Sequence, residues 1–181
     1  DDPDLFGYVV RRDGRRLTDT VPQKDAASFE ATVTPDWAAH AFDANPTTVW
    51  PVFATTGEWT VHFASPVLVE RIHLRFASQG GSTQGPARYT VLARWQDRYV
   101  PVVRVRDGTR LSVEHAFPLP FATTALRVVL ESPARIADLA IDRLEVVPAG
   151  TSAFDEDAVP EGRHAYEVAA IDRYGAVGPA G

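Results

Sequence analysis

Oxygen-bearing side chains are concentrated in one short stretch, residues 43–50, which reads Asp-Ala-Asn-Pro-Thr-Thr-Val-Trp. Asp43, Asn45 and Thr48 place a carboxylate, an amide and a hydroxyl close together in a segment that favours a tight loop. A hard cation such as calcium takes about six to eight oxygen ligands at flexible angles, so this loop is a candidate calcium site. The alternative is that Asp43 and Asn45 only cap a turn by accepting main-chain hydrogen bonds.

Residues capable of acid–base catalysis are present but form no recognisable pattern. The five histidines are scattered and lack a metal-ligand spacing such as His-x-x-x-His; they are His40, His62, His73, His115 and His164. The acidic pairs Asp36 with Asp43 and Asp155 with Asp157 offer carboxylates. A glycosidase needs its two carboxylates on either side of a cleft, and this spacing indicates none. We therefore expect no enzymatic activity.

Charge and composition narrow the classes of partner. The net charge of −6 disfavours nucleic acid or an anionic membrane as a partner, because either attracts a basic surface. The sequence has no apolar run of about 18 residues that would span a bilayer. It also contains no cysteine, which excludes disulfides and thiolate chemistry, and no methionine even at position 1. We therefore expect a processed or excised piece of a larger protein.

Alternation of apolar and polar residues is the dominant pattern along the chain. This period of two, typical of half-buried strands, occurs in residues 59–63, 71–76, 89–95 and 126–131. Turn-forming residues such as Asp107-Gly108 separate the segments. Only residues 36–44 are compatible with a short helical turn. The pattern predicts an antiparallel β-sandwich.

Six motifs in order between about Ala31 and Val147 resemble those of discoidin (coagulation factor 5/8 type C) domains, which include carbohydrate-binding family 32. Residues 43–50 resemble that family's Asp-Gly-Asn-Pro-x-Thr-x-Trp segment, with Ala44 in place of glycine. The other five are the Trp59 strand, with Phe63-Ala64-Ser65 in place of Asp-Leu-Gly, then Val69 to Leu74, Tyr89-Thr90-Val91 with Asp97-Arg98-Tyr99, Thr124 to Arg127, and Ile141 to Val147. The resemblance implies an all-β, galactose-binding-like antiparallel β-sandwich (jelly roll) over residues 27–149.

The same resemblance implies a set of calcium ligands. In that family the Asp-x-Asn-x-x-Thr segment and a glutamate on the last strand hold the ion. By position, the ligands here would be Asp43, Asn45, Thr48 and Glu145, with main-chain carbonyls completing the shell. The ion would be structural, joining the start of the sandwich to its end. The turn-capping alternative stays open.

Glycan-binding members of the family use loops at one end of the sandwich, where an aromatic face meets arginine, histidine or asparagine side chains. The candidates here are Trp37, His40, Phe53, Gln79 and Arg88. For Trp37 and Phe53 the alternative is packing in the core or in a loop. A sugar-contacting arginine that many relatives carry would fall near Ala77-Ser78, and it is absent.

The two ends of the chain resemble parts of a fibronectin type III domain. Residues 7–14 resemble its strand C, and residues 166–172 with Gly175 resemble its strand F, with Tyr166 at the position of a tyrosine corner. This implies additional fibronectin type III-like strands from both termini. They would form a partial, split sandwich of residues 1–26 and 150–181 that encloses the discoidin-like module. The alternative is that the ends are ordinary linker strands.

The leading functional hypothesis is a non-catalytic accessory module, glycan-binding, from a larger secreted or cell-envelope carbohydrate-active protein of a bacterium. The alternative is a structural or protein-interaction domain of a large assembly that has lost the sugar site, which the missing arginine favours. We expect a glycan or neighbouring domains of the parent protein as partner, outside the cell or in its envelope. We expect no nucleic-acid partner, and the net charge disfavours lipid binding as well.

Overall fold

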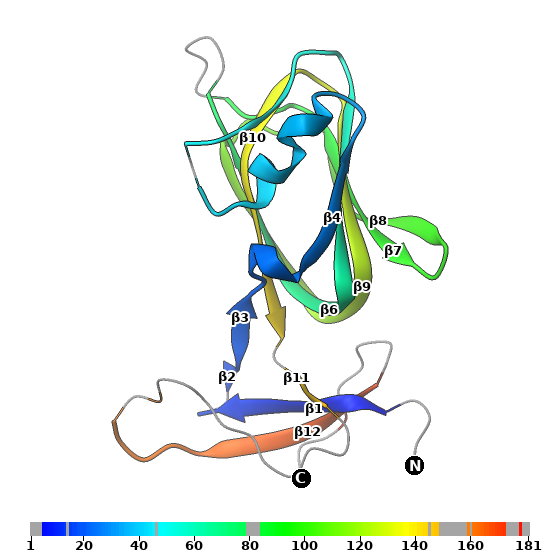
Figure 1. The fold of residues 1–181 in the computed structure, drawn as a ribbon. Coiled ribbons are helices and arrows are strands. Elements are labelled where there is room, and N and C mark those ends of the chain that lie inside the picture. Colours follow the sequence, from blue (N-terminus) through cyan, green and yellow to red (C-terminus); the bar gives the residue numbers. More distant parts are fainter. Residues whose placement is uncertain are drawn as a thin grey trace.

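The computed structural model of the chain describes residues 5–13, 15–45, 47–78, 84–144, 146–148, 159, 161–172 and 178. These residues form two antiparallel sheets, one of eight strands and one of four, with two short 3-10 helices (Figure 1). The predicted all-β fold class is confirmed. Within the described ranges, the structure has no helix that is long and apolar enough to cross a membrane.

The larger sheet has the strand order β3-β10-β6-β9-β7-β8, with β4 paired to β6 and β5 paired to β10. Its strands are β3 (Thr18–Thr20), β4 (Ala26–Ala31), β5 (Trp50–Val52), β6 (Gly57–Phe76), β7 (Tyr89–Trp95), β8 (Arg98–Val105), β9 (Ser112–Leu130) and β10 (Ala134–Leu144). The 3-10 helices are η1 (Gln23–Asp25) and η2 (Pro35–Phe42), and η2 lies within the predicted helical region.

Two long strands turn this sheet into a sandwich. The first half of β6 pairs with β4 and with the second half of β9, whereas the second half of β6 pairs with β10 and with the first half of β9. The register shifts between His62 and Val67, where residues 64–66 are exposed. Because β6 and β9 bend together at this point, each contributes to both layers (Figure 1).

The core lies between the two layers and follows the predicted alternation. Ile72 and Leu74 on β6 are fully buried, while Arg71 and His73 between them face the other side and are partly exposed. Trp50 and Trp59 are also fully buried. Their indole N–H groups donate to main-chain carbonyls of the segment that carries η2: Trp50 to Val33 at 3.0 Å and Trp59 to Ala38 at 2.7 Å. The two tryptophans therefore fix η2 against the sandwich.

The smaller sheet joins the two ends of the chain. Strand β1 (Leu5–Arg12) lies between β11 (Val146–Pro148) and β12 (Tyr166–Asp172) and also pairs with β2 (Arg15–Arg16). Its buried face packs on the bend of the sandwich through Val9, Ile171 and Leu68. Residues 18–20 already pair with the larger sheet, so the chain enters that sheet before the boundary expected at residue 26. Residues 146–148 already pair with the smaller sheet, so the chain returns to it before the boundary expected at residue 150.

Candidate functional site

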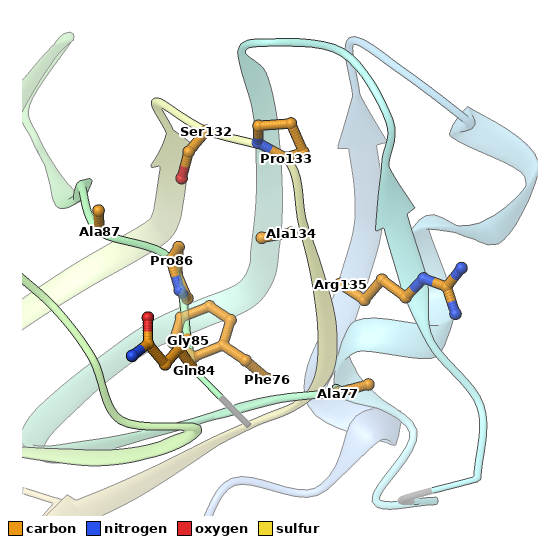
Figure 2. Close-up of a pocket in the computed structure, with 10 residues that line it drawn as sticks. All are labelled: Phe76, Ala77, Gln84, Gly85, Pro86, Ala87, Ser132, Pro133, Ala134 and Arg135. Carbon is orange, nitrogen blue, oxygen red and sulfur yellow. The ribbon is translucent and has the colours of Figure 1, made fainter. Parts of the chain in front are cut away.

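Three segments meet at the end of the sandwich that lies away from the smaller sheet (Figure 1), and a pocket lies between them (Figure 2). The segments are the end of β6 at Phe76 and Ala77, residues 84–87 before β7, and residues 132–135 at the start of β10. The cavity has a volume of about 260 Å³. We call it the loop-end pocket.

Main-chain hydrogen bonds hold the walls of this pocket together. The N–H of Ala77 donates to the carbonyl of Arg135 at 2.9 Å, and the N–H of Glu131 donates to that of Arg88 at 3.1 Å. Gly85 packs so closely on the neighbouring chain that a Cβ at this position would lie 2.1 Å from the main-chain oxygen of Arg110. These bonds fix the pocket without a ligand, which lowers the entropic cost of filling it.

The lining combines an apolar floor with a few polar groups. Phe76 and Ala134 are almost completely buried, and Gln84, Ser132 and Arg135 supply polar atoms. Ser132 Oγ and Arg135 Nε are buried and have no hydrogen-bond partner within the described part of the chain. Figure 2 shows the Ser132 hydroxyl directed into the space above Phe76 and Pro86, whereas the guanidinium of Arg135 points away from it. None of the described lining residues is acidic.

The loop of residues 43–48 is held by its own side chains. The Asp43 carboxylate accepts hydrogen bonds from the Asn45 N–H at 2.9 Å and from the Thr48 hydroxyl at 2.7 Å. Asn45 Oδ1 accepts the N–H and the hydroxyl of Thr47, at 3.1 and 2.7 Å. Ala44 has a φ of 56°, so it adopts the left-handed conformation that glycine would favour. The main-chain hydrogen bonds that the turn-capping alternative expects are therefore present in this loop.

A second carboxylate faces this loop from β10. Burial raises the pKa of Asp138, and the negative charge of Asp43 raises it further, while Arg75 and His73 lower it. Asp138 is brought here because β5, which follows the loop, pairs with the start of β10 at Trp50 and Ile136. Within the described ranges, no three His, Cys, Asp or Glu side chains gather as a metal site. A cation would therefore also need amide, hydroxyl or main-chain oxygens.

Comparisons with known proteins find relatives in structure only. No protein-family model and no curated protein matches the sequence. Among solved structures, the family 32 module of NanJ from Clostridium perfringens, in complex with galactose, has a TM-score of 0.60 at 18% identity, covering 70% of this chain and 99% of that one. The chain has the fold of a family 32 carbohydrate-binding module.

Two further family 32 modules give a similar match. CpGH89CBM32-5 from Clostridium perfringens, in complex with GalNAc-β-1,3-galactose, has a TM-score of 0.56 at 16% identity, covering 68% of this chain and 99% of that one. The module of AlyQ, in complex with 4,5-unsaturated mannuronic acid, has a TM-score of 0.53 at 13% identity, covering 65% and 95%. The predicted discoidin-like sandwich is thus confirmed as a fold.

The residues that the sequence proposed for sugar binding in this family 32-like sandwich occupy separate places. Trp37, half-exposed on η2, lies with its ring 5.9 Å from that of His40, and neither lines the loop-end pocket. Phe53 is 64% exposed, and the Arg135 guanidinium lies 5.7 Å from its ring centroid, so it stands beside the pocket. Arg88 is exposed next to the lining residue Ala87. Gln79, like the expected calcium ligand Glu145, lies outside the described residues.

Sequence reasoning missed Ser132, Arg135 and Asp138. Ser132 and Pro133 read as an ordinary turn between two strands, and only the pairing of β10 with β6 brings that turn opposite Phe76. Two of the histidines, by contrast, have separate partners. His73 Nε2 lies 3.0 Å from Asp142, and His115 Nε2 lies 2.9 Å from the Tyr89 hydroxyl.

Proposed function

We propose that the chain is a non-catalytic glycan-binding module and that the loop-end pocket is its binding site. The observation that carries the proposal is the buried Ser132 Oγ, which is directed into this pocket and has no hydrogen-bond partner among the described residues. A buried polar group without a hydrogen bond costs free energy, and a ligand hydroxyl in the pocket would remove that cost.

The remaining lining suits a sugar. A saccharide ring presents C–H groups on its faces and hydroxyls around its rim, so it binds to aromatic surface flanked by hydrogen-bonding groups. Phe76 lies under the pocket, Gln84 and Ser132 flank it, and Phe53 adds an exposed ring beside Arg135. The three similar structures named above contain galactose, GalNAc-β-1,3-galactose and 4,5-unsaturated mannuronic acid, which supports saccharides as the ligand class.

The non-catalytic part of the proposal rests on the same lining. Glycoside hydrolysis requires two carboxyl groups on opposite sides of the scissile bond. The described residues around the loop-end pocket include no Asp or Glu to supply them. A module that holds a glycan without cleaving it fits a role as the accessory part of a larger secreted or cell-envelope carbohydrate-active protein.

We further propose that the 43–48 loop holds a structural calcium ion. Asp43, Asn45 and Thr48 supply a carboxylate, an amide oxygen and a hydroxyl, which are ligands of the type that calcium prefers. Asp138 adds a carboxylate close enough to Asp43 to raise its own pKa, and a bound cation would relieve that repulsion. The ion would join the loop to β10.

A glycan array followed by calorimetric titration tests the glycan-binding proposal. We expect millimolar to micromolar binding of at least one saccharide, corresponding to about −4 to −8 kcal/mol. Ser132→Ala and Gln84→Ala are expected to weaken binding, because each removes a polar group that lines the pocket. Arg104→Ala, at an exposed position on β8, is the matched control and should bind like the parent.

Two results would overturn the proposal. Absence of saccharide binding across the array, with calcium present, would favour the structural or protein-interaction alternative. Binding that Ser132→Ala and Gln84→Ala leave unchanged would place the site elsewhere on the chain.

A further inference from the structure

A second pocket lies at the other end of β7, beside the turn that joins β7 to β8. This hairpin projects from the side of the sandwich (Figure 1). Its turn and the bends of β6 and β9 form an open hollow of about 410 Å³, which is lined by residues 94–96, residues 122–124 and Pro66. We call it the hairpin pocket. Strand β7 separates it from the loop-end pocket by about 20 Å, at about 3.3 Å per residue.

The hairpin pocket is built on a fixed framework. Thr123 is buried, and its hydroxyl oxygen accepts the N–H of Arg94 at 3.0 Å and lies 2.7 Å from the carbonyl oxygen of Ala125, to which it donates. These bonds attach the end of β7 to the bend of β9. Gln96, in the turn, has a φ of 51°, a left-handed conformation that is unfavourable for glutamine. A two-residue hairpin turn requires this conformation at its first position, so the turn itself holds Gln96 at the edge of the pocket.

The groups that line the hairpin pocket match the chemistry of a neutral sugar. Trp95 contributes an indole that is 38% exposed, and Gln96 and Thr124 contribute an amide and a hydroxyl. The charge of Arg94 is balanced locally, because its Nη2 lies 3.6 Å from the Asp97 carboxylate and its Nε donates to the carbonyl of Gln96. An anionic sugar would therefore gain little charge attraction here, whereas a neutral ring can stack on the indole and use the polar groups.

We propose that the hairpin pocket is a second saccharide site, which takes a neutral pyranose ring stacked on Trp95. The site is independent of the loop-end pocket and shares no lining residue with it. Two sites at opposite ends of one strand allow a single chain to hold two points of a glycan. Such linkage raises the apparent affinity for a polysaccharide above that for one sugar ring.

Chemical-shift mapping of the whole ¹⁵N-labelled chain tests this proposal, with the methyl glycosides of galactose, glucose and mannose as probes at concentrations up to tens of millimolar. At least one probe is expected to shift the Trp95 indole signal and the amide signals of Gln96 and Thr124 in a saturable way. Trp95→Ala should weaken this binding by roughly tenfold or more. Gln96→Gly provides a second variant that removes the amide while relieving the strained backbone, so its fold should be retained.

Trp37→Phe, at the other exposed tryptophan, is the matched control and should leave the binding at Trp95 unchanged. The proposal is overturned if none of the three probes causes a saturable shift at Trp95 and Gln96. It is also overturned if Trp95→Ala and Gln96→Gly both bind the probe as the parent does. Signals of Ala87 and Ala134 report the loop-end pocket separately, so failure at one site is distinguished from failure at the other.

Discussion

The charge of the Asp138 carboxylate distinguishes a calcium site in the 43–48 loop from a turn that is only capped. Burial and the nearby charge of Asp43 raise its pKa, so the folded state favours the protonated carboxyl. Without a cation, its contribution to stability is therefore greatest at low pH and declines as the pH rises through its shifted pKa. At neutral pH the ionised carboxylate destabilises the calcium-free fold.

We therefore predict that one substitution stabilises the calcium-free chain and weakens the stabilisation by calcium. Asp138→Asn should raise the melting temperature of the calcium-free chain at neutral pH, because it removes the unfavourable charge. The gain should stay below about 1 kcal/mol, since the carboxyl is only partly buried and is screened by water. The same substitution should reduce the rise in melting temperature that added calcium causes in the parent chain, as measured by differential scanning calorimetry.

Asp97→Asn, on the exposed β7–β8 turn, is the matched control and should keep the full response to calcium. If millimolar calcium does not change the melting temperature of the parent chain, the side chains of the 43–48 loop serve only to cap the turn. That outcome would remove the calcium proposal while leaving the fold intact.

The sequence predicted that residues 43–48 form a tight loop, because a local run of turn-forming and oxygen-bearing side chains specifies a local structure. It did not predict Asp138, Ser132 or Arg135, because each of these depends on strand pairing. Asp138 reaches the loop through the pairing of β5 with β10, and no local pattern around residue 138 specifies that register.

At the scale of elements, a hydrogen bond between Tyr89 and His115 joins the two layers just below the loop-end pocket. Tyr89 belongs to β7, and His115 lies on the half of β9 that pairs with the other layer. The Tyr89 ring also contacts Phe76, the floor of the pocket, with 5.5 Å between ring centroids. Burial raises the pKa of Tyr89 to about 12, so its hydroxyl stays protonated and can donate to the neutral imidazole.

The partner histidine predicts a loss of stability in mild acid. Burial lowers the pKa of His115, so the unfolded chain binds its proton more readily than the folded chain. The neutral, buried His115 therefore contributes its full stabilisation of the fold above about pH 6.5, the ordinary pKa of histidine. This stabilisation is lost as the pH falls through the lower pKa that His115 has in the folded chain. Melting temperatures measured between about pH 7.5 and 5 should fall with pH, and His115→Gln should flatten this dependence.

Tyr89→Phe separates the hydrogen bond from the titration. It keeps the ring against Phe76 but removes the donor, so it should cost about 1 kcal/mol at neutral pH. The decline in mild acid should remain, because His115 stays buried. A pH profile identical in the parent and in His115→Gln would show that another group controls the acid response.

The strands themselves were largely predictable, since a period of two specifies which side chains face the core. The two-layer arrangement was harder to predict from the sequence, because β6 and β9 each run through both layers. Only the bend in each strand separates the part in one layer from the part in the other. The alternation in residues 89–95 placed Trp95 on the core face with Tyr89 and Val91. Instead, the strand leaves the core at its end, and Trp95 is partly exposed in the hairpin pocket.

On the scale of the whole molecule, the smaller sheet closes the bend of the sandwich. Strands β1 and β12 come from opposite ends of the chain, and their pairing extends from Leu5 with Asp172 to Arg12 with Tyr166. This sheet packs through a small apolar cluster that includes Val9 and Ile171 from its own strands and Leu144 at the end of β10. Whether it is part of a split fibronectin type III domain stays a prediction.

If the smaller sheet is a separate unit, weakening its cluster should loosen it alone. Ile171→Ala removes a fully buried side chain and should cost about 2–5 kcal/mol within that unit. Hydrogen exchange followed by mass spectrometry is expected to speed up in β1 and β12 while β6 and β9 stay protected. Val168→Ala, on the exposed face of the same strand, is the control and should have little effect. Equal acceleration in both sheets would mean that they unfold together.

The central claim, that the loop-end pocket binds a glycan, is tested most directly by chemical-shift mapping with the saccharide that binds best on the array. The largest saturable changes should fall on the amide signals of Ala87, Ser132, Ala134 and Arg135, which line the pocket. Saccharide binding that leaves these four signals unmoved, or an array on which no glycan binds, would contradict the claim.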